Sequence, residues 1–164
     1  MYAQRNARNA SRPAGRRPSY APPAIRARIG LLMRKGSNFA SMEDAERTVR
    51  ASGLGLAPVS TGEPSMSDGG MTILATASMG DLDTGVLRAL VVPDGSDDQA
   101  EAGKAAARAI KAGLPVIAFG DSIDAVANAA GVRSVESPAA MFSGGDARAI
   151  SDTKALTSAA DTIR

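Results

Sequence analysis

Two apolar runs, each followed by small apolar residues at helical spacing, mark the centre of the chain. Leu87–Val92 is apolar except for Arg88, and Pro115–Phe119 is apolar throughout, as is typical of strands covered on both faces. The helical patterns that follow end at Gly113 and Gly131. On the first of these helices, five small or apolar residues are predicted to face the sheet: Ala100, Gly103, Ala106, Ala107 and Ile110.

Weaker patterns flank this centre on both sides. Residues 28–33 predict a first strand, 41–53 a helix and 54–60 a second strand, in which Pro58 indicates either a sheet edge or an early end of the strand. Residues 71–77 predict a hairpin or an added strand, and residues 132–135, a loop at 144–145, residues 147–150 and a helix from about Thr153 follow. This order predicts an α/β fold of the flavodoxin-like kind, with a mainly parallel sheet and helices on both faces.

Ligands of such sheets bind beyond the carboxyl ends of the strands. The loops at residues 34–38, 93–96 and 120–122 are therefore expected to lie near one another. Gly36, Ser37, Asp94, Gly95, Gly120, Asp121 and Ser122 are the residues expected to line the resulting cleft.

The first 24 residues differ from the rest in composition. They contain Arg5, Arg8, Arg12, Arg16 and Arg17, no acid and no apolar periodicity, which predicts a disordered basic arm ahead of a single domain over residues 25–164. The formal net charge of the chain is +2, but ten basic and seventeen acidic residues follow position 42, a net charge of −7. The arm is suited to an anionic partner such as nucleic acid or an acidic protein surface, and its composition also fits a targeting segment or an extension without a specific partner.

Absent residue types restrict the chemistry more than any motif does. The chain has no cysteine and no histidine. Disulfides, thiolate nucleophiles and sulfur-based zinc sites are thereby excluded, together with the usual general base near neutral pH. No metal and no cofactor is expected. No apolar run is long enough to span a membrane, and a cytoplasmic location is expected.

The junction Gly120-Asp121-Ser122 joins a buried strand to a helix, where many α/β enzymes hold a nucleophile. Ser122 is the candidate nucleophile, with Asp121, Asp124 or Lys104 as its base. The simpler interpretation is that Asp121 or Ser122 caps the helix. Asp94, Asp97 and Asp98 fit turn and cap positions better than a cation site or a phosphate acceptor.

The residues 87–95 and 112–120 together resemble the ThiJ/PfpI-like proteins of the class I glutamine amidotransferase superfamily. In that family a "D-A-L-V-L-P-G-G" strand and turn precedes a helix and then "A-G-K-P-V-A-A-I-C-H-G", whose cysteine is the nucleophile. The resemblance places the family's cysteine on Gly120 and its histidine on Asp121, and no carboxylate occurs in residues 36–39, where the family's acid is expected. It implies the family's fold, and homo-oligomers.

Together these observations favour a non-catalytic binding or assembly module with a basic arm. One alternative is a residual hydrolase of amidase or peptidase type that uses Ser122 or a cleft carboxylate. Another is a sensor for a small anion or another small ligand at the vacated elbow cleft, where main-chain N–H groups of residues 120–122 begin a helix.

Overall fold

The computed structural model describes residues 28–33, 47, 50–51, 53–62, 65–68, 71–95 and 99–163. Residues 47, 50 and 51 are helical, and the remainder of the helix predicted before Gly53 lies outside the described residues. The predicted arm over residues 1–24 and the candidate cleft residues Gly36 and Ser37 also lie outside them.

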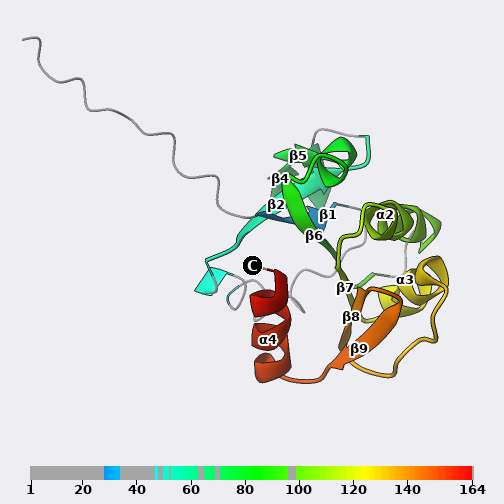
Figure 1. Cartoon of the computed structure of the whole chain (residues 1–164). Coiled ribbons are helices and arrows are strands. Elements are labelled where there is room, and N and C mark those ends of the chain that lie inside the picture. Colours follow the sequence, from blue (N-terminus) through cyan, green and yellow to red (C-terminus); the bar gives the residue numbers. More distant parts are fainter. Residues whose placement is uncertain are drawn as a thin grey trace, which may run out of the picture.

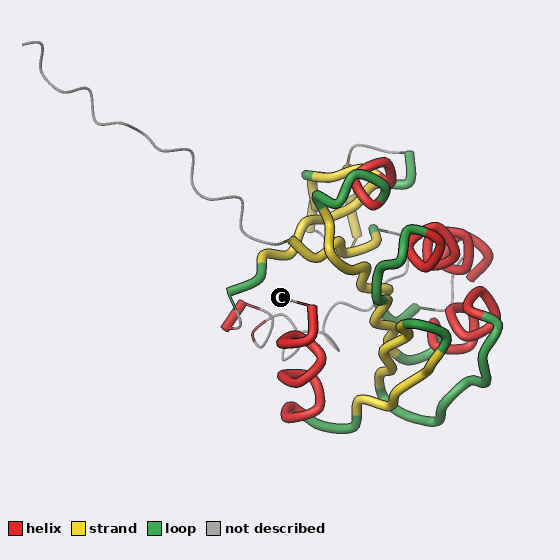
Figure 2. The backbone as a smooth tube through the Cα atoms, in the orientation of Figure 1, coloured by secondary structure: helices red, strands yellow, loops and turns green. Residues whose placement is uncertain are grey.

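A seven-stranded sheet has the strand order β5-β2-β1-β6-β7-β8-β9. Figure 2 shows in yellow that strands form the centre of the molecule. The strands of the sheet are β1 (Arg28–Leu32), β2 (Gly55–Ser60), β5 (Ala77–Ser78), β6 (Leu87–Val92), β7 (Val116–Phe119), β8 (Ala139–Ser143) and β9 (Asp146–Ile150). The first five in the spatial order run parallel, β8 runs antiparallel to β7, and β9 runs antiparallel to β8. The mainly parallel sheet predicted from the strand–helix alternation is confirmed.

Helices cover both faces of this sheet, as predicted. Helices α2 (Gln99–Lys111) and α3 (Ser122–Ala130) lie on one face, and α4 (Thr153–Ile163) lies on the other (Figure 1). The core is accordingly divided into two layers. One layer joins Leu90, Val92 and Phe142 to the alanines of α2, and the other joins Val91 and Ile117 to α4.

The face of α2 that contacts the sheet differs from the predicted one. Its buried residues are Ala102, Ala105, Ala106 and Ala109, whereas Ala100 and Ala107 are exposed and Gly103 is half-buried. Only Ala106 and the partly buried Ile110 of the predicted face pack on the core. Small residues occur on most sides of this helix, so their spacing alone did not show which side faces the sheet.

The segment between β2 and β6 contains both a hairpin and an added strand, which were predicted as alternatives. Strands β3 (Ser65–Asp68) and β4 (Met71–Leu74) pair as a separate antiparallel hairpin, while β5 is added to the main sheet. Both interpretations of Pro58 are wrong. Strand β2 continues past it to Ser60, and β5 pairs with Val59 and Ser60, so β2 is not an edge strand. The main-chain N–H of Thr76 also donates to the carbonyl of Pro58, at 3.0 Å. Pro58 has no N–H to donate to the ladder, and its main-chain hydrogen bond to this segment is made by its carbonyl.

Candidate functional site

The elbow between β7 and α3 is built on a glycine. Gly120 has a φ of 54°, a left-handed conformation that glycine adopts without strain. Its N–H donates to the carbonyl of Pro138 at 3.0 Å, and its carbonyl accepts the N–H of Ile123 at 3.2 Å. The four preceding residues form the fully buried β7, so the chain has to leave the core sharply at this point. The predicted strand-turn-helix shape is present.

The side chain of Asp94 fills the space above this elbow. A Cβ placed on Gly120 would lie only 2.2 Å from Oδ1 of Asp94 and 2.3 Å from its Cγ. Oδ1 accepts two main-chain hydrogen bonds, one from Gly95 at 2.9 Å and one from Asp121 at 2.9 Å. The carboxylate thus lies where the side chain of an elbow nucleophile would begin.

Two main-chain N–H groups directed at one oxygen are the arrangement by which acyl-transfer enzymes stabilise an oxyanion. Here the oxygen belongs to Asp94 of the protein itself, at the N-terminal end of α3, where the helix dipole favours a negative charge. The expectation of a vacated elbow is therefore wrong. An external anion would have to displace Asp94 before it could reach the N–H groups of Gly95 and Asp121.

Ser122 lies directly beneath this elbow and is completely buried. Its hydroxyl donates to the carbonyl of Pro93 at 2.7 Å, which ties α3 to the end of β6. A proton donated to a main-chain carbonyl is not transferred to a base, so the geometry is that of a structural serine. Of the two predicted caps, Asp121 does occupy the N-cap position of α3, but its side chain forms no capping hydrogen bond. Asp94 supplies a carboxylate at that end instead.

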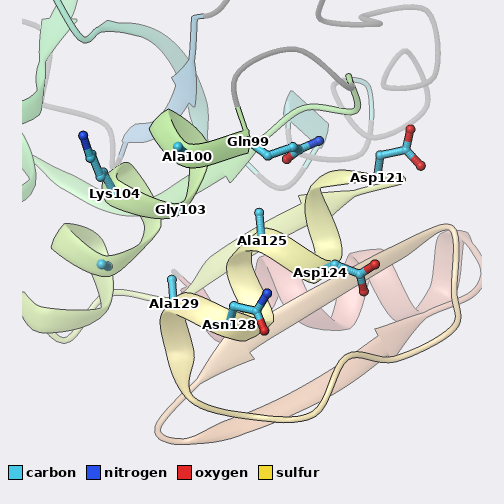
Figure 3. Close-up of a pocket in the computed structure, with 10 residues that line it drawn as sticks. Gln99, Ala100, Gly103, Lys104, Asp121, Asp124, Ala125, Asn128 and Ala129 are labelled. Atoms are coloured by element: carbon cyan, nitrogen blue, oxygen red, sulfur yellow. The ribbon is translucent and has the colours of Figure 1, made fainter.

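A groove of about 890 Å³ lies beside the elbow, between α2 and α3 (Figure 3). Its floor is made of small residues, including Ala100, Gly103 and Ala125, and charged side chains of both signs, among them Lys104 and Asp124, line it. At the end next to Asp121, the Gln99 amide donates to the carbonyl of Gly95 at 2.6 Å. In the part of the chain that the structure describes, the buried Oε1 of Gln99 has no hydrogen-bond partner.

The structure brings together five of the seven residues predicted to line the cleft. Asp94 and Gly95 follow β6, and Gly120, Asp121 and Ser122 follow β7, where hydrogen bonds join the two loops. The role of Asp94 as the internal partner of the elbow was missed. A signal for it exists in the quoted family pattern, which has glycine where this chain has Asp94 and cysteine where it has Gly120. Relative to that pattern, this chain lacks a side chain at position 120, after β7, and has an additional one at position 94, after β6.

Among the described residues, no three or more histidine, cysteine, aspartate or glutamate side chains are grouped so that they could hold a metal ion. None of the helices in the described ranges is both long enough and apolar enough to cross a membrane.

The parallel sheet, the elbow after β7 and the helices on both faces together define the DJ-1/ThiJ/PfpI fold, a flavodoxin-like α/β architecture. The fold implied by the resemblance to ThiJ/PfpI-like proteins is thus confirmed. By sequence, the chain matches no family model and no curated protein.

The chain is similar to several solved structures. DJ-1beta of Drosophila melanogaster is similar with a TM-score of 0.58 and 12% identity over 84% of this chain and 88% of that one. A mutant DJ-1 superfamily protein of Salmonella typhimurium has a TM-score of 0.57 and 14% identity, with the same coverage of 84% and 88%. A ThiJ/PfpI family protein from Pseudomonas syringae also has a TM-score of 0.57 and 14% identity, over 84% of this chain and 68% of that one. Identities this low establish the fold alone.

Proposed function

We propose that this chain is a non-catalytic ThiJ/PfpI-like binding or assembly module, which associates with copies of itself and carries a basic N-terminal arm. The observation that supports it best is the Asp94 carboxylate over Gly120, bonded to the N–H groups of Gly95 and Asp121. An elbow of this kind keeps its main-chain geometry while the position of the reactive group is filled by an inert one.

The residue types available support the same proposal. With no histidine and no cysteine in the chain, Ser122 would need a carboxylate or a lysine as its base. Its hydroxyl is instead buried and donates to Pro93. A carboxylate nucleophile at Asp94 is disfavoured as well, because the hydrogen bonds to Oδ1 stabilise its charge in the ground state.

Hydrolysis assays test the non-catalytic part of the proposal. Activated esters and amides are incubated with the wild-type chain and with Ser122→Ala, and both are expected to match the rate in buffer. Turnover by the wild type that disappears in Ser122→Ala would establish a residual serine hydrolase instead. Turnover that survives in Ser122→Ala and disappears in Asp94→Asn would assign the activity to the carboxylate.

The arm is proposed to join neighbouring subunits in the cytoplasm, because five arginines and no acid precede a body of opposite charge. Light scattering of the full-length chain and of residues 25–164 tests this proposal, with a larger and salt-sensitive mass expected for the full-length chain. An identical monomeric mass in both would contradict it. Salt-sensitive binding of DNA or RNA that is lost with residues 1–24 would identify nucleic acid as the arm's partner instead.

A further inference from the structure

The main sheet has one long edge without a partner in the described part of the chain, the outer side of β9 (Figure 1). At the opposite edge, β5 has only two residues, Ala77–Ser78, and offers little backbone for pairing. Strand β9 has five residues, Asp146–Ile150, four of which are not buried. A strand edge of this length presents N–H and C=O groups that can pair with another chain.

The hairpin turn determines which backbone groups face outward. Gly144 and Gly145 have φ values of 59° and 84° and join Ser143 to Asp146, the pattern of a two-residue type I′ turn. The residues that flank such a turn form a hydrogen-bonded pair, and pairs alternate from there along the strands. The odd-numbered Ala147 and Ala149 therefore direct their N–H and C=O groups away from β8. Neither residue has a main-chain partner on that side among the described residues.

Two charged side chains accompany these outward backbone groups. Asp146 and Arg148 are two positions apart in β9, so they lie on the same face of the sheet. Both are exposed, and within the described ranges neither forms an ion pair. Ala147, between them, is half-buried against the core on the opposite face. Of the two alanines with outward backbone groups, Ala147 is thus the one flanked by an acid and a base.

We propose that β9 pairs antiparallel with β9 of a second copy of this chain, about a two-fold axis at Ala147. Ala147 then exchanges both main-chain hydrogen bonds with Ala147 of the partner subunit. Asp146 lies opposite Arg148 of the partner subunit, and Arg148 lies opposite the partner's Asp146. These flanking positions form non-hydrogen-bonded pairs, whose side chains approach most closely, so the axis generates two cross-strand ion pairs. The sheets of both copies become continuous.

The charges also exclude the neighbouring registers. An axis at Arg148 would place Arg148 opposite itself, and an axis at Asp146 would place Asp146 opposite itself. An axis at Ala149 would place Arg148 opposite Ile150 of the partner subunit and Asp146 beyond the end of the partner's β9, so neither charge would gain an opposite partner. Like charges in direct opposition destabilise a strand pair, and charged side chains protect edges in this way. The same two side chains thus oppose general edge pairing and favour a single symmetric register.

This inference rests on the assembly part of the proposed function, and a charge exchange at β9 tests it on the full-length chain. Sedimentation velocity or light scattering at low salt, over roughly 5–500 µM, covers the weak affinities expected of a small interface. Arg148→Asp places acid opposite acid and should raise the dissociation constant at least about 10-fold. The double variant Asp146→Arg with Arg148→Asp restores opposite charges in the same register. It should return the constant to within about 3-fold of the wild type.

Lys154→Glu is the matched control, because it changes the net charge as much as Arg148→Asp does and lies on the exposed side of α4. It should associate like the wild type. Association that Arg148→Asp leaves unchanged, or that the double variant fails to restore, would overturn the β9 interface alone. A wild-type chain that stays monomeric throughout the concentration range would overturn the interface and the assembly role together.

Discussion

At the scale of single residues, Gly120 and Asp94 are coupled by geometry. Gly120→Ala introduces a methyl group about where the Asp94 carboxylate lies, and it does so at a φ of 54°. Gly131 is the matched control, since its φ is 68° and nothing lies within 4 Å of an added Cβ. Gly131→Ala should cost about 1 kcal/mol from backbone strain alone, and Gly120→Ala about 2–4 kcal/mol.

Urea denaturation of the Gly120→Ala and Asp94→Ala variants and of their combination measures this coupling. Asp94→Ala removes a charged acceptor of two N–H groups and should cost about 1.5–3 kcal/mol. In that background Gly120→Ala should cost no more than Gly131→Ala does, because the clash is gone. Strictly additive costs for Gly120→Ala and Asp94→Ala would show that Asp94 does not fill the elbow.

A single introduced thiol reports on the same site, because the chain has no other cysteine. Gly120→Cys combined with Asp94→Gly leaves the N–H groups of Gly95 and Asp121 free to stabilise a thiolate at the start of α3. Iodoacetamide should modify this thiol at least about 10-fold faster than the thiol of Gly120→Cys alone, where Asp94 opposes the thiolate charge. Ser143→Cys, at an exposed position, is the reference thiol. Equal rates with and without Asp94 would contradict the proposed filling.

The elbow also separates what the sequence could predict from what it could not. The turn at Gly120 was predictable, because a fully apolar strand, a glycine and a helical pattern are consecutive in the chain. The contact with Asp94 was not, because it joins two loops that only the sheet brings together. Considered alone, Asp94 fits an ordinary turn. It is distinguished only by comparison with the family pattern, which has glycine at the position of Asp94 and cysteine at the position of Gly120.

At the scale of elements, β1 lies inside the sheet between β2 and β6, and side chains of both neighbouring regions leave no room for a side chain at Gly30. A Cβ on Gly30 would lie 2.8 Å from Cγ2 of Val59 and 3.0 Å from Cδ1 of Leu87. Gly30→Ala should therefore destabilise the fold by about 1–3 kcal/mol through overpacking. Gly55→Ala in β2, where nothing lies within 4 Å, should be neutral or slightly stabilising. Thermal unfolding compares the two variants, and equal melting temperatures would contradict this packing.

The connection before β6 is joined to α2 by an exposed ion pair. Arg108 donates to Oδ2 of Asp83 through Nη2 at 2.6 Å and through Nε at 3.2 Å. These hydrogen bonds lower the pKa of Asp83 below its ordinary value of 3.8. Because the folded-state pKa is depressed, the pair stabilises the fold above the ordinary value, and this contribution is lost as pH falls through the folded-state pKa.

Asp83→Asn should accordingly be less stable than the wild type at pH 7 and low salt, with a small difference because both side chains are half-exposed. The difference should disappear in strong acid, and it should shrink in 1 M salt. Urea midpoints at pH 7 and at successively lower pH measure it. A difference that is constant across this pH range would show that Asp83 acts through packing and not through its charge.

The β8–β9 end of the main sheet was only partly predicted from the sequence. The glycines at 144–145 indicated a loop and residues 147–150 lie within β9, but β8 was missed and residues 132–135 form no strand. At this end the sheet is completed by the antiparallel β8–β9 hairpin and not by a further parallel strand. The residues of β8 did not indicate its direction, because β8 is buried and apolar like the parallel strands, and only the sheet shows that it runs antiparallel to β7.

At the scale of the whole molecule, positive charge is concentrated in the first 24 residues, whose sequence has no acid and no apolar periodicity that would predict a place in the core. The five arginines of residues 1–24 supply more positive charge than the formal net value of +2 for the entire chain. Deleting these residues changes the formal net charge from +2 to −3. Stability and charge should therefore respond to the deletion independently.

Residues 25–164 should unfold in urea with a free energy within about 0.5 kcal/mol of the full-length value at a concentration where both are monomeric. The slope of the transition should also be unchanged, because it follows the surface exposed on unfolding. Retention of the shortened chain on a cation exchanger should be lost at neutral pH, since its net charge has changed sign. A loss of more than 1 kcal/mol on deletion would mean that the arm packs on the body and belongs to the domain. Unchanged stability combined with lost retention would establish the arm as a separate charged extension, free to contact a partner.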